Sequence, residues 1–287
     1  MLIDVHHVTR YTYSAPVRLD PQLARLKPRT DPFQALRRFD LRIQPPGAQV
    51  SEGPDPEGNT ILHVVVEGPV TLFELDARSL VETRVPPEAP QGSPAAGARF
   101  PLQYPADVPL SVLVYRAPTT TDVAVNRFAA EVADGAGWEV LPFLALLAAR
   151  IQKTHAYQIR YEGYPRPGAM TLERREGACR DFAALYMEAC RAMGLAVRFV
   201  SGYRIKEPEG IGRELHAWVE VFLPGLGWRG YDPTIGKPVT DQHVAVAAGT
   251  PSSSAPVTGS FWGSGVTSQL YASVEVRRAM PEVMGAT

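Results

Sequence analysis

Cysteine is scarce in this sequence, whose 287 residues contain only Cys179 and Cys190. Both fall in one predicted helix, three turns apart, which places them about 16 Å from each other. A disulfide between them is therefore excluded. Two cysteines that cannot pair are typical of a reducing compartment, so we expect a cytoplasmic protein.

Long apolar runs and a strong net charge are also absent. No stretch approaches the roughly 18 consecutive apolar residues that predict a membrane-spanning helix. The segment from Met1 to His7 lacks the basic and then apolar pattern of a signal peptide. The formal net charge is −1, which predicts no strong attraction to nucleic acid or to anionic membranes. We therefore expect neither nucleic acid nor a membrane as a partner.

Cofactor motifs are missing as well. The chain has no phosphate-cradling Gly-x4-Gly-Lys loop and no dinucleotide fingerprint after a strand. The adjacent His6 and His7 would point to opposite sides of a strand. His63, His155 and His243 have no ligand-like neighbours at a recognised metal spacing, and we interpret them as structural or surface residues. We expect no metal and no organic cofactor.

A segment rich in proline and glycine divides the chain. Residues 86–97 are typical of a linker because they hold four prolines and two glycines. Short β-rich runs between Pro, Gly and Asp clusters precede it and predict an antiparallel β-sandwich. We therefore expect an N-terminal β-sandwich domain at 1–90 and a catalytic core at 98–236. A C-terminal extension at 237–287 is expected to pack on the core.

The core region changes from a helical to a strand pattern along the chain. Helices are predicted at 121–133 and 139–153, and Thr121 or Asp122 is a plausible cap for the first. The helix with the two cysteines follows. Strands are then predicted at 196–206, 214–223 and 227–232. Helices followed by an antiparallel sheet indicate an α+β fold.

Cys179 lies at the first turn of its predicted helix. Apolar residues recur at helical spacing from Phe182 to Met193, and Gly194 supplies a natural end. The free N–H groups and the positive end of the helix dipole therefore surround Cys179, and both favour its thiolate. Cys190 falls on the apolar stripe and is expected to be a small buried hydrophobe.

His216 and Asp232 can complete an activated nucleophile. His216 opens a strand with period-two alternation, and a turn leads to a returning strand that ends at Asp232. If residues 223–227 form a five-residue loop, the two side chains are diagonal neighbours on one face, about 7–8 Å apart. The carboxylate could then orient the imidazole. A slip of one residue would put Asp232 on the other face.

Four ordered blocks resemble the bacterial transglutaminase-like superfamily. These blocks are Gly177–Ala183, Val200–Tyr203, Leu215–Glu220 and Gly227–Thr234. Segments near the N-terminus, among them His7–Val17 and Gly58-Asn59, are similar to the all-β domain that precedes the core in many bacterial members. The resemblance implies a papain-like core in which Cys179, His216 and Asp232 form the catalytic triad.

The sequence also departs from the pattern of the family. Arg180 stands where many relatives carry Gln, Leu215 where Ser is frequent, and Ile235 where Asn is common. The segment after Ala248 lacks the expected Gly-Arg-Asp run. None of these departures removes a member of the triad.

The triad predicts acyl transfer at Cys179. Its thiolate would attack a carboxamide or peptide carbonyl, His216 would protonate the leaving amine, and Asp232 would hold the imidazole tautomer. The backbone N–H of Cys179 is the expected oxyanion donor, with Tyr161 as a candidate side-chain donor.

Three classes of function stay open. The first is a transglutaminase-type acyltransferase that moves the acyl group of a protein or peptide substrate to a primary amine. The second is a cysteine peptidase or amidase that uses the same triad with water as the acceptor. The third is a non-catalytic scaffold, which the intact triad disfavours.

Overall fold

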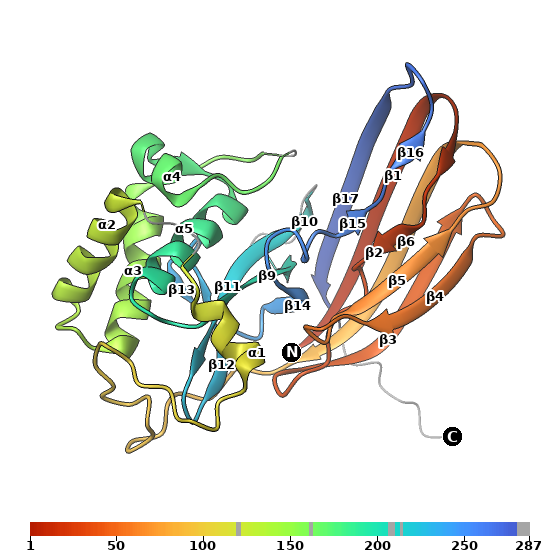
Figure 1. The fold of residues 1–287 in the computed structure, drawn as a ribbon. Helices are drawn as coiled ribbons and strands as arrows, with labels where there is room; N and C mark the ends of the chain where they lie inside the picture. Colours follow the sequence, from red (N-terminus) through yellow and green to blue (C-terminus); the bar gives the residue numbers. More distant parts are fainter. Residues whose placement is uncertain (119–121, 161–162, 206–209, 213–214, 280–287) are drawn as a thin grey trace, which may run out of the picture.

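The computed structural model describes residues 1–118, 122–160, 163–205, 210–212 and 215–279. The chain forms two lobes (Figure 1): a core lobe, in which helices cover an antiparallel sheet, and a β lobe of long strands. The predicted α+β class, with antiparallel sheets built from the N-terminal strands, is confirmed. Among these residues, no helix is long and apolar enough to cross a membrane.

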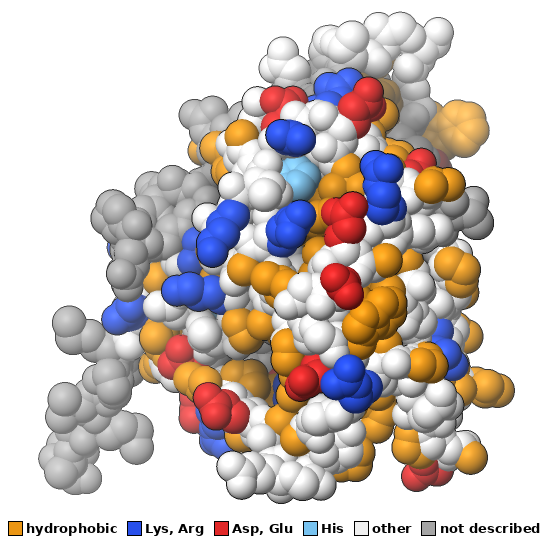
Figure 2. Space-filling view, turned by 90° about the vertical axis from the view of Figure 1, so that its left-hand side faces the viewer, with side chains coloured by type: hydrophobic (Ala, Val, Ile, Leu, Met, Phe, Trp, Pro, Cys, Tyr) orange, Lys and Arg blue, Asp and Glu red, His pale blue; other side chains and the backbone are white. Residues whose placement is uncertain are grey.

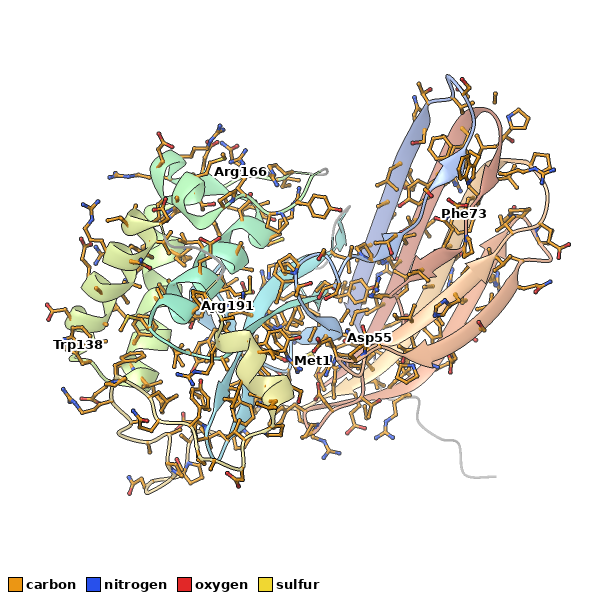
Figure 3. The ribbon with its side chains drawn as sticks, in the orientation of Figure 1. Met1, Asp55, Phe73, Trp138, Arg166 and Arg191 are labelled. Atoms are coloured by element: carbon orange, nitrogen blue, oxygen red, sulfur yellow. The ribbon has the colours of Figure 1, made fainter. Side chains whose placement is uncertain are left out.

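The β lobe consists of two antiparallel sheets that face each other. The larger sheet has the order β10-β17-β1-β6-β3, with β16 pairing β1, and the smaller one has the order β15-β2-β5-β4. Apolar side chains such as Phe73, Leu26 and Val64 are buried between them (Figure 3). The strands are β1 Leu2–Leu19, β2 Gln22–Ala24, β3 Gln34–Gln44, β4 Gln49–Pro54, β5 Thr60–Val65, β6 Val70–Thr83, β10 Gly210–Gly212, β15 Val257–Thr258, β16 Phe261–Trp262 and β17 Ser268–Arg278.

Strand β1 has the period-two alternation expected of a half-buried strand. Ile3, Val5, His7 and Thr9 are buried, and the residues between them are more exposed. His6 therefore points away from His7, as predicted, and its Nε2 lies 2.9 Å from Oδ1 of Asp76. The buried face of β1 turns partly toward the smaller sheet and partly toward the core lobe.

The core lobe packs helices on one face of a five-stranded sheet with the order β13-β12-β11-β9-β14. Helix α5 is almost wholly buried because it contacts three other helices as well as β9 and β11. Asp122 caps α2 by accepting hydrogen bonds from the N–H groups of Ala124 and Val125; Thr121 lies outside the described residues. The helices are α1 Leu110–Leu113, η1 Val114–Arg116, α2 Val123–Gly135, α3 Val140–Thr154, α4 Gly168–Arg174 and α5 Cys179–Ala192. The strands are β7 Ala156–Tyr157, β8 Glu176–Gly177, β9 Val197–Arg204, β11 His216–Leu223, β12 Gly227–Asp232, β13 Lys237–Pro238 and β14 His243–Gly249.

The C-terminal extension, which we expected to pack on the core, has strands in both lobes. Strand β14 joins the core sheet beside β9, but β15, β16 and β17 pair with strands of the β lobe. The pairing of β17 with β1 runs from Ile3 to Tyr13. Without β17, strand β1 would expose a row of unpaired backbone groups at the edge of the sheet. The β lobe is therefore built from segments near both ends of the sequence.

Two side-chain amides join the β lobe to the edge strand of the core sheet. Gln34 donates to the carbonyl of Ala245 and accepts from its N–H, both at 2.8 Å. Asn59 does the same with Ala248, also at 2.8 Å for both bonds. Each amide thus supplies a donor and an acceptor, as a neighbouring strand would. The register of β14 against β9 shifts between Ala245 and Ala247, within the stretch that the two amides bind.

Candidate active site

Cys179 is the first residue of helix α5, as predicted, and lines a cleft between the two lobes. The buried carboxylate of Asp181 organises this first turn by accepting hydrogen bonds from the N–H groups of Ala178 (2.9 Å) and Arg166 (2.8 Å). The N–H of Cys179 belongs to the same turn, where a helix offers no acceptor of its own. It is therefore available to an oxyanion in the cleft.

His216 and Asp232 come together through the predicted β11–β12 hairpin. Phe222 lies opposite Trp228 and Val219 opposite Tyr231, which is the register that places His216 and Asp232 on one face. Nε2 of His216 is 2.6 Å from Oδ2 of Asp232. The apolar residues of β11 pack under the helices, so the alternating residues, His216 among them, lie on the other face of the strand.

The imidazole of His216 lies between Asp232 and the thiol of Cys179. Burial alone would lower the pKa of His216, but the charge and hydrogen bond of Asp232 outweigh it. The sulfur of Cys179 acts in the same direction, as the acceptor of a hydrogen bond from the protonated imidazole and as a negative charge, and together these effects raise the pKa of His216 from 6.5 to about 10. Since Nε2 faces the carboxylate, Nδ1 is the nitrogen left for the thiol. The structure thus brings Cys179, His216 and Asp232 together in the order that a thiolate–imidazolium–carboxylate system requires.

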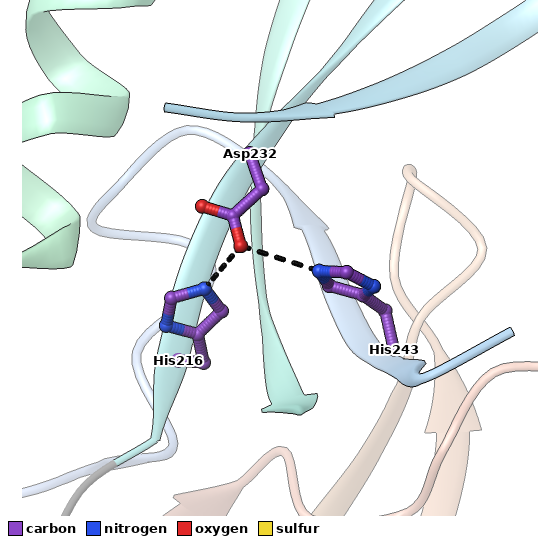
Figure 4. A group of neighbouring side chains, drawn as sticks. All are labelled: His216, Asp232 and His243. Atoms are coloured by element: carbon purple, nitrogen blue, oxygen red, sulfur yellow. Dashed lines mark hydrogen bonds and ion pairs between the residues drawn. The ribbon is translucent and has the colours of Figure 1, made fainter. Parts of the chain in front are cut away.

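A second histidine contacts the same carboxylate and was missed by the sequence analysis. Nε2 of His243, on β14, lies 3.2 Å from Oδ2 of Asp232 (Figure 4). The other carboxylate oxygen, Oδ1, accepts the N–H of Thr234 at 2.9 Å. Burial would raise the pKa of Asp232, but the two imidazoles hold it well below its usual range. The sequence analysis interpreted His243 as a structural or surface residue, because nothing at a recognised spacing indicated a partner.

The three side chains in Figure 4 also have the composition of a metal site. Their ligand atoms lie within 4.8 Å of one another. However, Nδ1 of His243 accepts the N–H of Thr240 at 3.3 Å, so the imidazole proton is on Nε2, the atom that faces Asp232. A metal-bound histidine has the opposite arrangement, with a free lone pair toward the metal and a proton on the other nitrogen. The donor set therefore favours a hydrogen-bond network over a metal centre.

The cleft at Cys179 has a volume of about 410 Å³ and three walls. The core contributes Cys179 and His216, and the inner face of the large β-lobe sheet contributes Thr9 and Leu270. Residues 251–258, which run between the lobes, form the third wall. No carboxylate lies among the described residues that line the cleft, and most of the lining is apolar.

Arginine supplies the permanent charge of the cleft. Arg160 and Arg180 line it next to Cys179. The guanidinium of Arg160 lies 3.3 Å from Asp181, and Arg180 donates to the carbonyl of Arg160 at 2.7 Å. Burial lowers the pKa of Arg160; Asp181 raises it, while Arg180 and the other nearby guanidinium groups lower it further. Basic side chains also gather on the upper part of the adjoining helical face (Figure 2).

The candidate oxyanion donor Tyr161 lies outside the described residues. Tyr164, which does line the cleft, is largely exposed, and its backbone carbonyl accepts a hydrogen bond from Arg160. The backbone N–H of Cys179 thus remains the oxyanion donor for which the described residues give a position.

A cysteine at a helix start, facing a histidine–aspartate pair on an antiparallel sheet, defines a papain-like cysteine-enzyme core. Residues 126–233 match the transglutaminase-like superfamily, and residues 3–82 match the bacterial transglutaminase-like N-terminal region. The uncharacterized protein Rv2569c of Mycobacterium tuberculosis is 30% identical over 266 residues, which cover 85% of this chain and 82% of that protein. The chain belongs to the transglutaminase-like superfamily.

Two further relatives bear on the fold and on the core. The structure of a candidate cysteine protease from Cytophaga hutchinsonii is similar with a TM-score of 0.71 at 18% identity, covering 99% of this chain and 92% of that one. This likeness extends the shared fold over both lobes. A Pseudomonas aeruginosa protein named protein-glutamine gamma-glutamyltransferase is 32% identical over 103 residues, which are 31% of this chain and 15% of that protein.

Proposed function

We propose that this protein is a cysteine-dependent acyltransferase that acts on carboxamide or amide groups of proteins or peptides. The observation that carries the proposal is the imidazole of His216, held by Asp232 at 2.6 Å and lining the same cleft as Cys179. The name of the Pseudomonas aeruginosa relative supports transfer to an amine over transfer to water.

The proposed reaction has two halves. In the first, the sulfur of Cys179 attacks the carbonyl carbon, and the carbonyl electron pair moves to oxygen, where the N–H of Cys179 can stabilise it. The C–N bond then breaks as His216 gives its proton to the leaving amine or ammonia. In the second half, His216 takes a proton from the acceptor, which attacks the thioester and releases the thiolate. Asp232 stabilises the imidazolium in both halves.

The cleft lining supports an extended peptide as the substrate. Apolar walls from both lobes can hold side chains on either side of the reacting carbonyl. The arginines beside Cys179, with no carboxylate among the described lining residues, favour an acidic over a basic residue next to that carbonyl. We further propose a reducing, cytoplasmic location, which suits two cysteines that are both free.

The proposed activity can be tested with a peptide library containing glutamine, with and without a primary amine, read by mass spectrometry. We expect amine adducts on glutamine, with acidic neighbours preferred, and no products with Cys179→Ala. Cleaved or deamidated peptides without adducts would assign the same site to hydrolysis. No Cys179-dependent product of either kind would contradict an acyl-transfer enzyme.

A further inference from the structure

We propose that His243 is a positioning residue that holds the carboxylate of Asp232 in the plane and charge state that His216 requires. This inference rests on the proposed function and extends its machinery to a fourth side chain, on β14. His243 contacts the same oxygen of Asp232 as His216 does, from a different direction (Figure 4).

The hydrogen bonds of His243 define its tautomer. Nδ1 accepts the backbone N–H of Thr240 at 3.3 Å, so Nε2 carries the proton and donates it to Oδ2 of Asp232 at 3.2 Å. A neutral imidazole satisfies both bonds at once, whereas a protonated ring would lose the bond to Thr240. His243 therefore donates to Asp232 as a neutral imidazole, whereas His216 donates to it as an imidazolium.

Asp232 needs this second donor because its side chain is completely buried. Three N–H groups, from His216, His243 and Thr234, surround its two oxygens. Donors from three directions define the carboxylate plane, and a buried charge is stable only when its oxygens are satisfied. Without His243, Oδ2 keeps only the bond to His216 and Oδ1 the bond to Thr234, so the buried carboxylate loses one of the three donors that hold its plane.

Trp218 makes the two imidazoles one packed unit. Its ring lies edge-on to His243, with centroids 5.3 Å apart, and tilted against His216 at 6.0 Å. Trp218 is buried and packs on Val200, Ala245 and Ala248 of the two strands beyond β11. The rotamer of each histidine is therefore set by a shared, rigid neighbour.

The charged groups around His243 come from every side of this unit. Asp232 and His216 face it from β12 and β11, and Arg204 acts on it from β9. Asp31, Arg84 and Glu220 line the small hollow that also reaches its ring. Burial and the positive charges of His216 and Arg204 lower the pKa of His243, while Asp232 raises it. The carboxylate of Asp232 is the only acidic group in hydrogen-bond contact with it among the described residues.

The test compares His243→Gln with His243→Asn by the rate at which Cys179 is alkylated by iodoacetamide, and by kcat, across a range of pH. A glutamine amide reaches the position of Nε2, but an asparagine amide is too short. We expect His243→Gln to stay near the wild type. His243→Asn should lower kcat by roughly ten- to hundredfold with little change in KM. Its loss of activity on acidification should also begin at a higher pH, since Asp232 loses a donor that depresses its pKa.

His155→Leu serves as the control, because it removes another buried histidine outside this network. It should leave the pH profile in place. Equal kcat and equal pH profiles for His243→Asn and the wild type would overturn the proposal. A wild type that turns over no substrate, yet whose alkylation profile shifts in His243→Asn, would contradict the proposed function and leave the positioning role supported.

Discussion

The two cysteines of helix α5 differ in surroundings more than in exposure. Cys190 is fully buried among apolar side chains, and burial raises the pKa of its thiol well above the usual value. Cys179 lies at the helix start, beside His216 and the cleft. Iodoacetamide at neutral pH should therefore label Cys179 at least about tenfold faster than Cys190. Peptide mapping after timed labelling measures both rates, and equal rates in the folded protein would argue against an activated thiol.

The raised pKa of His216 has a consequence for stability. The folded state binds the proton more tightly than the unfolded state, whose histidine titrates near 6.5. Protonated His216 therefore contributes its full stabilisation of the folded state below about pH 6.5, and this contribution is lost as the pH rises through about 10. Urea unfolding at pH 7 and pH 9.5 should show a larger loss of stability for the wild type than for His216→Gln. Equal losses would mean that His216 is not protonated in the folded protein.

The triad could be predicted from sequence because local rules place each member. Gly194 and the apolar stripe locate the cysteine helix, and the alternation of β11 with its short turn sets the register of Asp232. The contact of His243 with Asp232 depends on the pairing of β14 with β9 and on the irregular register of that pairing. No local sequence pattern encodes either. For the same reason, the pairing of β17 with β1 was not predicted.

Among the elements, the edge of β14 depends on two amides from the other lobe. Asn59→Ala would leave the N–H and carbonyl of Ala248 without partners in a buried site. We expect it to cost about 2 kcal/mol or more of unfolding free energy. Gln49→Ala, which removes an exposed amide bonded to Glu67, should cost less than about 0.5 kcal/mol. Urea denaturation of both variants measures the difference, and similar values would show that the amide is dispensable.

At the scale of the whole molecule, the contacts between the lobes lead us to expect that they fold as one unit. A chain that starts at Arg99 lacks β1 to β6, so β17 loses β1 and β14 loses the amides of Gln34 and Asn59. The apolar side chains of Tyr203, Val244 and Val246 would also be uncovered. We expect this truncated protein to aggregate. Size-exclusion chromatography and Cys179 labelling test this, and a soluble monomer labelled like the full chain would contradict it.

The pairing of β1 with β17 also has a consequence for how the protein is made. Translation produces β1 first, yet its partner is the last described strand, and Leu270 and Ala272 of that strand line the cleft at Cys179. Cys179 and His216 emerge from the ribosome well before this wall. The cleft at Cys179 can thus be completed only after β17 has been synthesised, and a nascent chain that stalls before Ser268 would carry Cys179, His216 and Asp232 without this wall.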